Sequence, residues 1–378
     1  MKQGWNILKL SDACTLTMGQ SPISESCNTD GDGLPFFQGC SDFGKINPTI
    51  RTYCNAPTKI AEANDVLMSV RAPIGTLNIA NVKCCIGRGL ASFRATSRTT
   101  NSYLYYFLKH SRTKLESLGT GSTFKAIGKD ALSKFPIPVP PIEEQKAICS
   151  LLDKMNRVIE AKKEQLKELD NLAQAIFYDM FGDPITNTKG WVLSTIDNIS
   201  TDKLSYGSGA SAVEYDGLTR YVRITDINDL GDLNEDIKSP SEIDEKYLLR
   251  EGDILFARSG ATVGKTYCHR EKNGRCIYAG YLIKMRPDKS KVMPKYVFYY
   301  TKSEYYKAFI KNAQNAVAQP NINAKQYGGL VVPIPPLPLQ QAFAEKVKAI
   351  EQQKELINQS IKDVQTLFDA KMDYYFGD

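Results

Sequence analysis

Residues 136–183 read PIPVPPIEEQKAICSLLDKMNRVIEAKKEQLKELDNLAQAIFYDMFGD, and residues 331–378 read VVPIPPLPLQQAFAEKVKAIEQQKELINQSIKDVQTLFDAKMDYYFGD. The two stretches align without a gap at a constant offset of 195 residues, and both end in Phe-Gly-Asp. An internal repeat of this length indicates a chain built from two related halves. Such a chain suits a partner that itself has two related halves.

Each repeat contains a long segment with the spacing of a coiled coil. Residues 143–180 contain neither Pro nor Gly, and apolar residues recur there in steps of four and three, interrupted at Lys162. This spacing favours two helices that pair with each other, over two separate amphipathic helices that each cover a globular part. The residues predicted to form the pairing seam are Ile148, Leu152, Met155, Ile159, Leu166, Leu169, Phe343, Val347, Ile350, Ile357, Ile361 and Val364.

Proline-rich stretches mark where each helix leaves a globular part. They read FPIPVPP at 135–141 and VPIPPLP at 332–338, and proline holds such segments extended. We therefore predict a first globular domain at 1–142, a central helix at 143–180, a second globular domain at 181–337 and a C-terminal helix at 338–378. The fold class is α+β: two globular α/β domains separated by two long antiparallel helices that form a coiled coil, with a pseudo-twofold internal repeat.

Composition narrows the class of protein. The 378 residues are 42% hydrophobic and 24% charged, with no apolar run long enough for a membrane span. Nine cysteines without CxxC spacing favour a reducing cytoplasm, and two histidines leave few ligands for a metal, so we expect none. Lys and Arg outnumber Asp and Glu by 16 to 9 in 1–142 and by 21 to 18 in 181–337. This excess favours a polyanionic partner.

The globular parts share a plan. Each has a strand that begins with an acid and runs into a glycine turn, DVLMSVRAPIG at 65–75 and DILFARSGATVG at 253–264. Each also has an aromatic segment near its end, YLYYFL at 103–108 and YVFYY at 296–300. The helical spacing of these aromatic residues predicts core-facing helices rather than stacking platforms for bases.

Several strings resemble the specificity subunit of type I restriction-modification systems. They are CCIGRGLASFR (84–94), GSTFKAIGKDALSKFPIPVPPIEEQKAI (121–148), FGDP followed by KGW (181–191), GDILFARSGATVGK (252–265) and AQPNINAKQYGGLVVPIPPLPLQQ (318–341). The resemblance covers nearly the whole chain and includes the order domain, helix, domain, helix.

The resemblance implies a function. Each globular domain would read one half of a bipartite double-stranded DNA target, while the helices fix the unread spacer and dock two modification (methyltransferase) subunits. Restriction (translocase and nuclease) subunits would join that core. The resemblance also implies that S-adenosylmethionine, ATP and Mg belong to the partner subunits, so that this chain has no cofactor of its own.

Absent motifs agree with a non-catalytic role. The chain has no Gly-x4-Gly-Lys-Ser/Thr loop for ATP, and its Pro-Pro pairs lack the polar and aromatic neighbours found in amino-methyltransferases. The string Glu235-Asp236-Ile237-Lys238 keeps open a reader with its own nuclease activity. A second alternative is a coiled-coil adaptor without sequence-specific DNA reading.

Loop residues with amide, hydroxyl or cationic side chains are the natural candidates for DNA contacts. They are Gln38, Arg71, Arg88, Ser122, Thr123 and Lys125 in the first domain, and Arg223, Arg258, Lys265, Gln319 and Asn321 in the second. Arg71 and Arg258 both follow apolar strands, so an internal salt bridge with a neighbouring acid is the alternative for these two. No catalytic residue is predicted.

Overall fold

The computed structural model describes residues 4–121, 125–315 and 321–377. The chain divides into two compact units, unit 1 being Met1–Ala161 with Ser360–Asp378 and unit 2 being Lys162–Gln359. Each unit contains one globular part and a portion of both long helices. The α+β arrangement predicted from the sequence is confirmed.

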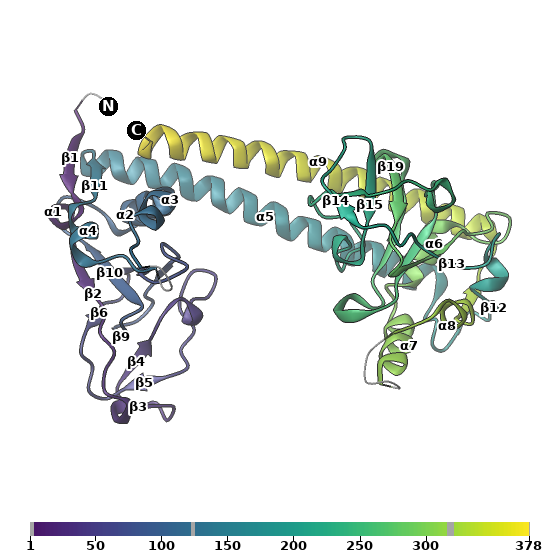
Figure 1. Ribbon diagram of the computed structural model, residues 1–378, viewed down its shortest axis with the longest axis horizontal. Coiled ribbons are helices and arrows are strands. Elements are labelled where there is room, and N and C mark those ends of the chain that lie inside the picture. Colours follow the sequence, from purple (N-terminus) through teal and green to yellow (C-terminus); the bar gives the residue numbers. More distant parts are fainter. Residues whose placement is uncertain (1–3, 122–124, 316–320, 378) are drawn as a thin grey trace. The chain divides into compact units, whose positions relative to one another are not determined.

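The two long helices are α5 (Ile142–Phe181) and α9 (Leu337–Phe376), each 40 residues long. Figure 1 shows both as unbroken helices. Their bounds lie within two residues of the predicted 143–180 and 338–378. The boundary between the two compact units crosses both helices, so each unit contains part of each helix. The sequence had instead predicted a separate segment for each helix.

Unit 1 contains two sheets and a two-stranded ribbon. One sheet has the order β2-β10-β7-β8, the other has the order β3-β5-β4-β9-β6, and β1 pairs with β11. The strands are β1 (Asn6–Lys9), β2 (Cys14–Met18), β3 (Cys27–Asn28), β4 (Leu34–Phe37), β5 (Tyr53–Cys54), β6 (Ile60–Ala61), β7 (Val66–Ser69), β8 (Leu77–Ile79), β9 (Cys84–Ile86), β10 (Leu90–Ala95) and β11 (Pro136–Val139). The short helices are α1 (Leu10–Ala13), α2 (Asn101–His110), α3 (Arg112–Ser117) and α4 (Lys129–Lys134).

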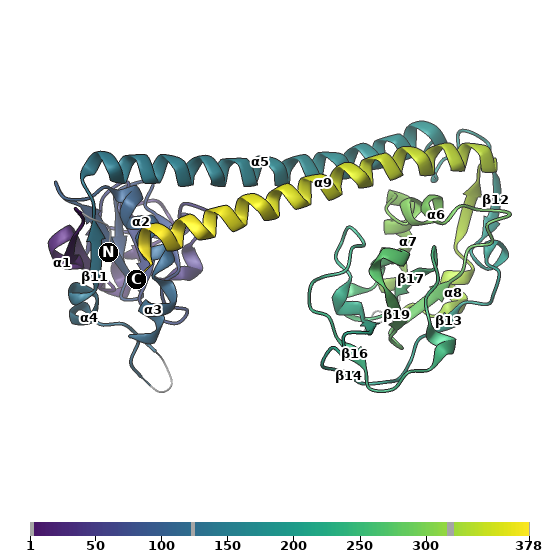
Figure 2. The ribbon, with the colours of Figure 1, turned by 90° about the horizontal axis from the view of Figure 1, so that it is seen from above.

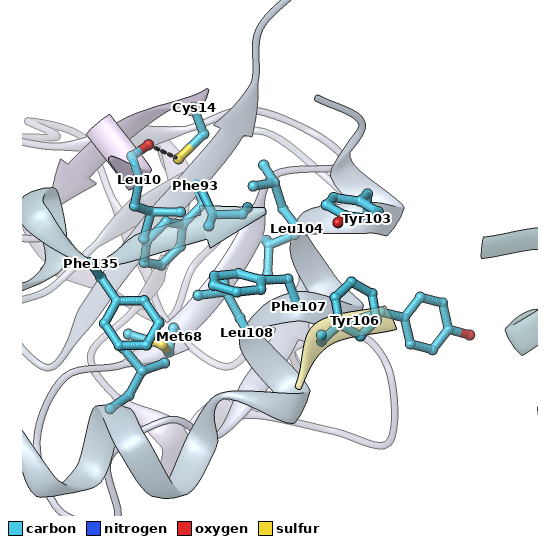
Figure 3. Packing of buried hydrophobic residues seen from close by; sticks show 14 of the residues in the cluster. Leu10, Cys14, Met68, Phe93, Tyr103, Leu104, Tyr106, Phe107, Leu108 and Phe135 are labelled. Atoms are coloured by element: carbon cyan, nitrogen blue, oxygen red, sulfur yellow. Dashed lines mark hydrogen bonds between the residues drawn. The ribbon is translucent and has the colours of Figure 1, made fainter. Parts of the chain in front are cut away.

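The core of unit 1 lies between its four-stranded sheet and α2 (Figure 3). Phe93 of β10 and Phe107 of α2 are buried there, and the Phe107 ring lies 5.8 Å from that of Phe135. Tyr103 is fully buried and donates a hydrogen bond from Oη to the Pro138 carbonyl, 2.7 Å away. The aromatic segment at 103–108 is therefore a core helix, as predicted.

Unit 2 repeats this plan. Its four-stranded sheet has the order β13-β20-β17-β18, β15 and β19 form a parallel pair, and β12-β21 and β14-β16 form antiparallel ribbons. The strands are β12 (Val192–Thr195), β13 (Ser205–Tyr206), β14 (Ala212–Val213), β15 (Thr219–Val222), β16 (Ser239–Pro240), β17 (Ile254–Ala257), β18 (Thr266–Cys268), β19 (Arg275–Tyr278), β20 (Leu282–Met285) and β21 (Val331–Ile334). The short helices are α6 (Pro294–Tyr300), α7 (Glu304–Asn315) and α8 (Ala324–Gly328). The aromatic segment at 296–300 lies in α6 and is mostly buried, as predicted.

An ion pair between an arginine and a buried aspartate occurs at equivalent positions beside both four-stranded sheets. In unit 1, Arg94 donates from Nε and Nη2 to the two carboxylate oxygens of Asp65, at 2.8 and 2.9 Å. In unit 2, Arg286 makes the same two bonds to Asp253 at the same distances. Because Asp65 and Asp253 are each 1% exposed, the arginine forks supply the charge that burial of these carboxylates requires.

Each unit contains the start of one long helix and the end of the other. In unit 1, Phe368 and Phe376 near the end of α9 join the core that contains Leu152 of α5, and Figure 2 shows this end of α9 beside α2. In unit 2, Phe177 near the end of α5 lies 5.8 Å, ring to ring, from Phe343 of α9. Within each unit the two helices therefore run antiparallel.

All twelve residues predicted for the pairing seam are buried or half-buried. Ile148, Leu152, Ile159, Phe343, Val347 and Ile350 are buried. Met155, Leu166, Leu169, Ile357, Ile361 and Val364 are half-buried. Lys354 lies 195 residues after the seam residue Ile159, and its ammonium group pairs with Asp170 of α5 at 2.6 Å, which gives this cation a partner inside unit 2.

Among residues 4–121, 125–315 and 321–377, none of the helices combines the length and hydropathy that a membrane span needs. All nine cysteines are free thiols. Within the same ranges, no three His, Cys, Asp or Glu side chains are grouped closely enough to hold a metal ion.

Candidate nucleic-acid interface

Four loops of unit 1 meet at one end of its two sheets. Backbone hydrogen bonds join them: Gly87 N–H donates to the Phe37 carbonyl at 2.8 Å, and Gly89 N–H donates to the Gln38 carbonyl at 3.2 Å. The Val70 N–H in turn donates to the Gly89 carbonyl at 2.9 Å. The predicted contact residues Gln38, Arg71 and Arg88 therefore lie on neighbouring loops, although they are far apart in the sequence.

Lys125 belongs to the same cluster. Its carbonyl accepts a hydrogen bond from the Ala72 N–H at 3.2 Å, which ties the 125–127 segment to the loop that carries Arg71. The side chains of Arg71, Arg88 and Lys125 are exposed. None of the three forms an ion pair within the part of the chain that the structure describes, so all three positive charges face solvent.

Glycines permit this close approach of loops. A Cβ added at Gly19 would lie 2.1 Å from the Gly87 carbonyl oxygen, and one at Gly87 would lie 2.7 Å from Gln38 Oε1. Larger residues at either position would push the loops apart. The close approach of these loops therefore explains why glycine stands on both sides of Arg88, at 87 and 89.

Gln38 is held before any ligand binds. Its backbone N–H donates to Asp42 Oδ2 at 2.8 Å, and its Nε2 donates to Ser21 Oγ at 3.0 Å. The side chain nevertheless remains exposed. An oriented, exposed amide is suited to bidentate contact with adenine.

Unit 2 builds the corresponding cluster with different side chains. Its Gly207 N–H donates to the Leu282 carbonyl at 3.2 Å, as Gly19 does to Leu90 at 2.8 Å. Its Ile322 N–H donates to the Arg258 carbonyl at 2.8 Å, as Ile127 does to Val70 at 2.9 Å.

The position equivalent to Arg258 is therefore Val70, and the residue equivalent to Arg71 is Ser259. On sequence alone, Arg71 and Arg258 are comparable residues. In the structure, they occupy positions one residue apart in the equivalent loops after β7 and β17. The internal salt bridge considered for Arg71 and Arg258 is formed by other arginines instead, because Asp65 pairs with Arg94 and Asp253 pairs with Arg286.

Two predicted contact residues of unit 2 are engaged by carboxylates. Arg223 pairs with the fully buried Asp226 at 2.6 Å and with Asp236 at 2.9 Å. Hydrogen bonding to Asp226 raises the pKa of Arg223, and the bond from Arg223 lowers the pKa of Asp236. Asp236, from the nuclease-like string at 235–238, is thus part of an ion-pair network.

Lys265 is likewise paired, with Asp229 Oδ1 at 2.9 Å. This contact lowers the pKa of the Asp229 carboxyl group. The Lys265 side chain is 27% exposed, so its ammonium group is half-buried beside the Asp229 carboxylate. The lysine is therefore less available to a DNA phosphate than the exposed cations of unit 1.

Arg258 and Asn321 are in direct contact. Arg258 Nε donates to Asn321 Oδ1 at 3.2 Å, and the guanidinium carbon lies 4.8 Å from the centre of the Tyr206 ring. The predicted residues Ser122, Thr123 and Gln319 lie outside the described residues.

The sequence did not single out two exposed tyrosines of this cluster. Tyr206 and Tyr281 are 41% and 62% exposed, whereas most aromatic residues of unit 2 are buried. Each stands directly beside a glycine, Gly207 or Gly280. An aromatic residue next to such a glycine is the signal that could have identified them.

Comparisons with known proteins give the family. The family model described as "Type I restriction modification DNA specificity domain" matches residues 2–171 and 182–366. The chain belongs to this family. The two matched stretches divide the chain as the internal repeat does.

Among its relatives, a protein of Methanocaldococcus jannaschii named as the MjaX specificity subunit of a type I restriction enzyme is 41% identical over 177 residues, which is 46% of this chain and 42% of that protein. The EcoDI specificity subunit of Escherichia coli is 22% identical and covers 92% of this chain and 81% of its own length. The first three curated relatives are matched over 42%, 53% and 62% of their length, so the chain spans about half the length of the curated relatives it matches.

A solved structure shares the fold. The type I restriction-modification S subunit from M. genitalium superposes with a TM-score of 0.60, covering 100% of this chain and 98% of that chain at 16% identity. The chain therefore shares the α+β fold of that structure.

Proposed function

We propose that this chain is the DNA-sequence-recognition subunit of a type I restriction-modification complex. Each globular part reads one half of a bipartite double-stranded target. The observation that carries the proposal is the loop cluster that the two units build at equivalent positions with different side chains. A repeated scaffold with variable loop residues suits the reading of two different half-sites.

The chemistry of the unit 1 cluster supports this role. Arg71, Arg88 and Lys125 present positive charge to solvent, and cations of this kind bind phosphates or guanine edges. Gln38, held by Ser21, lies among them with an exposed amide. Groups of the kinds that bind phosphates and read bases therefore lie on neighbouring loops of unit 1, which supports the proposal.

The long helices have a second role in this proposal. They dock two modification subunits and set the number of unread base pairs between the half-sites, and restriction subunits join the assembly. In support, α5 continues without interruption from the globular part of unit 1 into unit 2. A continuous helix is stiff enough to transmit a fixed length.

Chemistry on DNA belongs to the partners in this proposal. S-adenosylmethionine, ATP and Mg are bound by the modification and restriction subunits, and this chain has no catalytic residue. The complex works in the cytoplasm, where its DNA substrate lies. The modification subunit flips the adenine that this chain has placed within its reach.

The test is methylation mapping of genomic DNA from cells that express this chain with its modification subunit. We expect a bipartite adenine-methylated motif with a fixed gap, absent from cells that lack the chain. If no new motif is found although the complex is isolated intact, the proposal is wrong and an adaptor role remains. DNA cleavage by the isolated chain with Mg²⁺ would instead assign it a nuclease activity.

A further inference from the structure

We infer that Arg258 reads a guanine in the half-site recognised by unit 2, through the two terminal amino groups of its guanidinium. The inference rests on the proposed function and adds to it a base identity and the residue that determines it. Two hydrogen bonds hold the backbone of Arg258. The Arg258 N–H donates to the Tyr281 carbonyl at 3.1 Å, and its carbonyl accepts from the Ile322 N–H at 2.8 Å.

The side chain is fixed as well. The guanidinium carbon lies 4.8 Å from the centre of the Tyr206 ring, and Nε donates to Asn321 Oδ1 at 3.2 Å. The contact with Tyr206 places the guanidinium group over the ring, and the hydrogen bond to Asn321 fixes the direction in which Nε points. Tyr206 is itself held, because it pairs with Ile283 across the sheet and its hydroxyl accepts from the Ala324 N–H at 3.1 Å.

These contacts leave the terminal amino groups available. In the described part of the chain, Nη1 and Nη2 of Arg258 make no hydrogen bond and the guanidinium forms no ion pair. This distinguishes Arg258 from Arg223 and Lys265, which are engaged by aspartates. Because Nε is bonded to Asn321 and the face of the guanidinium group lies over Tyr206, Nη1 and Nη2 remain as two donors side by side.

Two adjacent donors select one base. In the major groove, guanine presents two acceptors, O6 and N7, on one edge. Adenine presents an acceptor and a donor there, thymine presents one acceptor and a methyl group, and cytosine presents a donor. The fork of Arg258 therefore matches guanine and mismatches the other bases.

The experiment uses the full chain in complex with its modification subunit, with methylation mapping for the motif and DNA-binding titrations for affinity. The unit 2 half-site of the wild type should contain a G·C pair at a fixed position. In R258A and R258Q, discrimination at that position should fall about 10- to 100-fold. The rest of that half-site and the whole unit 1 half-site should be unchanged.

Two further variants separate base reading from charge and packing. R258K keeps the positive charge but lacks the fork, so it should also lose discrimination for guanine. Y206L removes the ring beneath the guanidinium and should weaken discrimination at the same position. R275A is the matched control, because Arg275 begins β19 at the end away from this cluster, and its motif should be unchanged.

Several results would overturn the inference while leaving the proposed function intact. One is a unit 2 half-site without any G·C pair. Another is R258A binding more weakly to all sequences with the motif unchanged, which would assign Arg258 to a phosphate. If R258A does not fold, the result for R258K tests the inference. Full discrimination for guanine by R258K would contradict it. A wild type without any bipartite motif would reject the proposed function itself.

Discussion

Gln145 and Gln340 are equivalent, fully buried residues that each fasten the start of a long helix to its globular part. Gln145 Oε1 accepts from the Thr100 N–H at 3.0 Å, and its Nε2 donates to the Pro140 carbonyl at 2.8 Å. Gln340 Oε1 accepts from the Met293 N–H at 2.8 Å, and its Nε2 donates to the Pro335 carbonyl at 2.7 Å. Because a buried amide satisfies a backbone donor and a backbone acceptor in both units, the exit from each globular part is rigid.

The first prediction concerns this joint. Q340L removes the amide and leaves the Met293 N–H and the Pro335 carbonyl without their buried partner. We expect the free energy of unfolding of the chain to fall by roughly 2–4 kcal/mol. Urea denaturation measures the loss, and Q341L at the exposed neighbouring position should change stability little. Equal stability of Q340L and Q341L would show that the joint contributes nothing.

The second prediction separates structure from DNA reading at Arg223. R223M leaves the buried Asp226 carboxylate without its cation, so stability should fall by about 3–5 kcal/mol. The bases read by unit 2 should be unchanged, because the guanidinium is already engaged. The control R275M breaks a surface pair with Glu245 and should cost at most about 1 kcal/mol. An altered motif with unchanged stability would instead place Arg223 on the DNA.

The third prediction is a dependence on pH. His269 is 3% exposed, contacts the Tyr267 hydroxyl through Nδ1 at 3.0 Å, and has its pKa lowered below 6.5 by burial. Since the unfolded chain takes up a proton at His269 that the folded chain resists, stability is full above about pH 6.5 and falls as the pH drops below it.

Melting temperatures of the wild type and H269Q measured from about pH 7 to pH 5 test this. H269Q should lose less stability over that range than the wild type does. H110Q changes the other histidine and should retain the acid-dependent loss in unit 2. Parallel melting curves for the wild type and H269Q would contradict the prediction.

The fourth prediction concerns the length of the helices. Lys354 pairs with Asp170 in unit 2, and counting from this pair in antiparallel order gives 162–168 and 356–362 as corresponding seven-residue segments for deletion. Deleting both segments removes one heptad from each helix, about 10 Å of rise. We expect the unread gap in the methylated motif to shorten by about three base pairs, with both half-sites unchanged.

The control for this deletion is the double substitution K163A/K167A, which alters the same segment without shortening it. Its gap should equal that of the wild type. An unchanged gap in an active double-deletion complex would show that the helices do not set the spacing.

The sequence was sufficient to predict the long helices and the two globular parts, because apolar spacing and proline are local signals. It also identified the core helices, since the aromatic residues around Tyr103 and Tyr296 recur with helical spacing. It could not show that Phe368 and Phe376 complete the core of unit 1. That contact depends on how distant segments pair, which no local pattern records.

The candidate interface was predictable only in part, for a similar reason. Gln38, Arg71, Arg88 and Lys125 were identified by their position in glycine-rich loops, and the fold brings these loops together. The engagement of Arg223 with Asp236 was not visible, because the carboxylate lies 13 residues away across a turn. Arg71 is the second residue after β7, whereas Arg258 is the first residue after β17, so the two arginines occupy different positions of equivalent loops.

The most direct test of the account is to replace residues 5–135 with the corresponding domain of a relative that reads a different half-site, and to map methylation again. If the units read independently, one half of the motif should change to that of the donor. The other half and the gap should be retained. A motif that changes in both halves, or that does not change in a complex shown to be folded, would contradict the claim that each unit reads its own half-site.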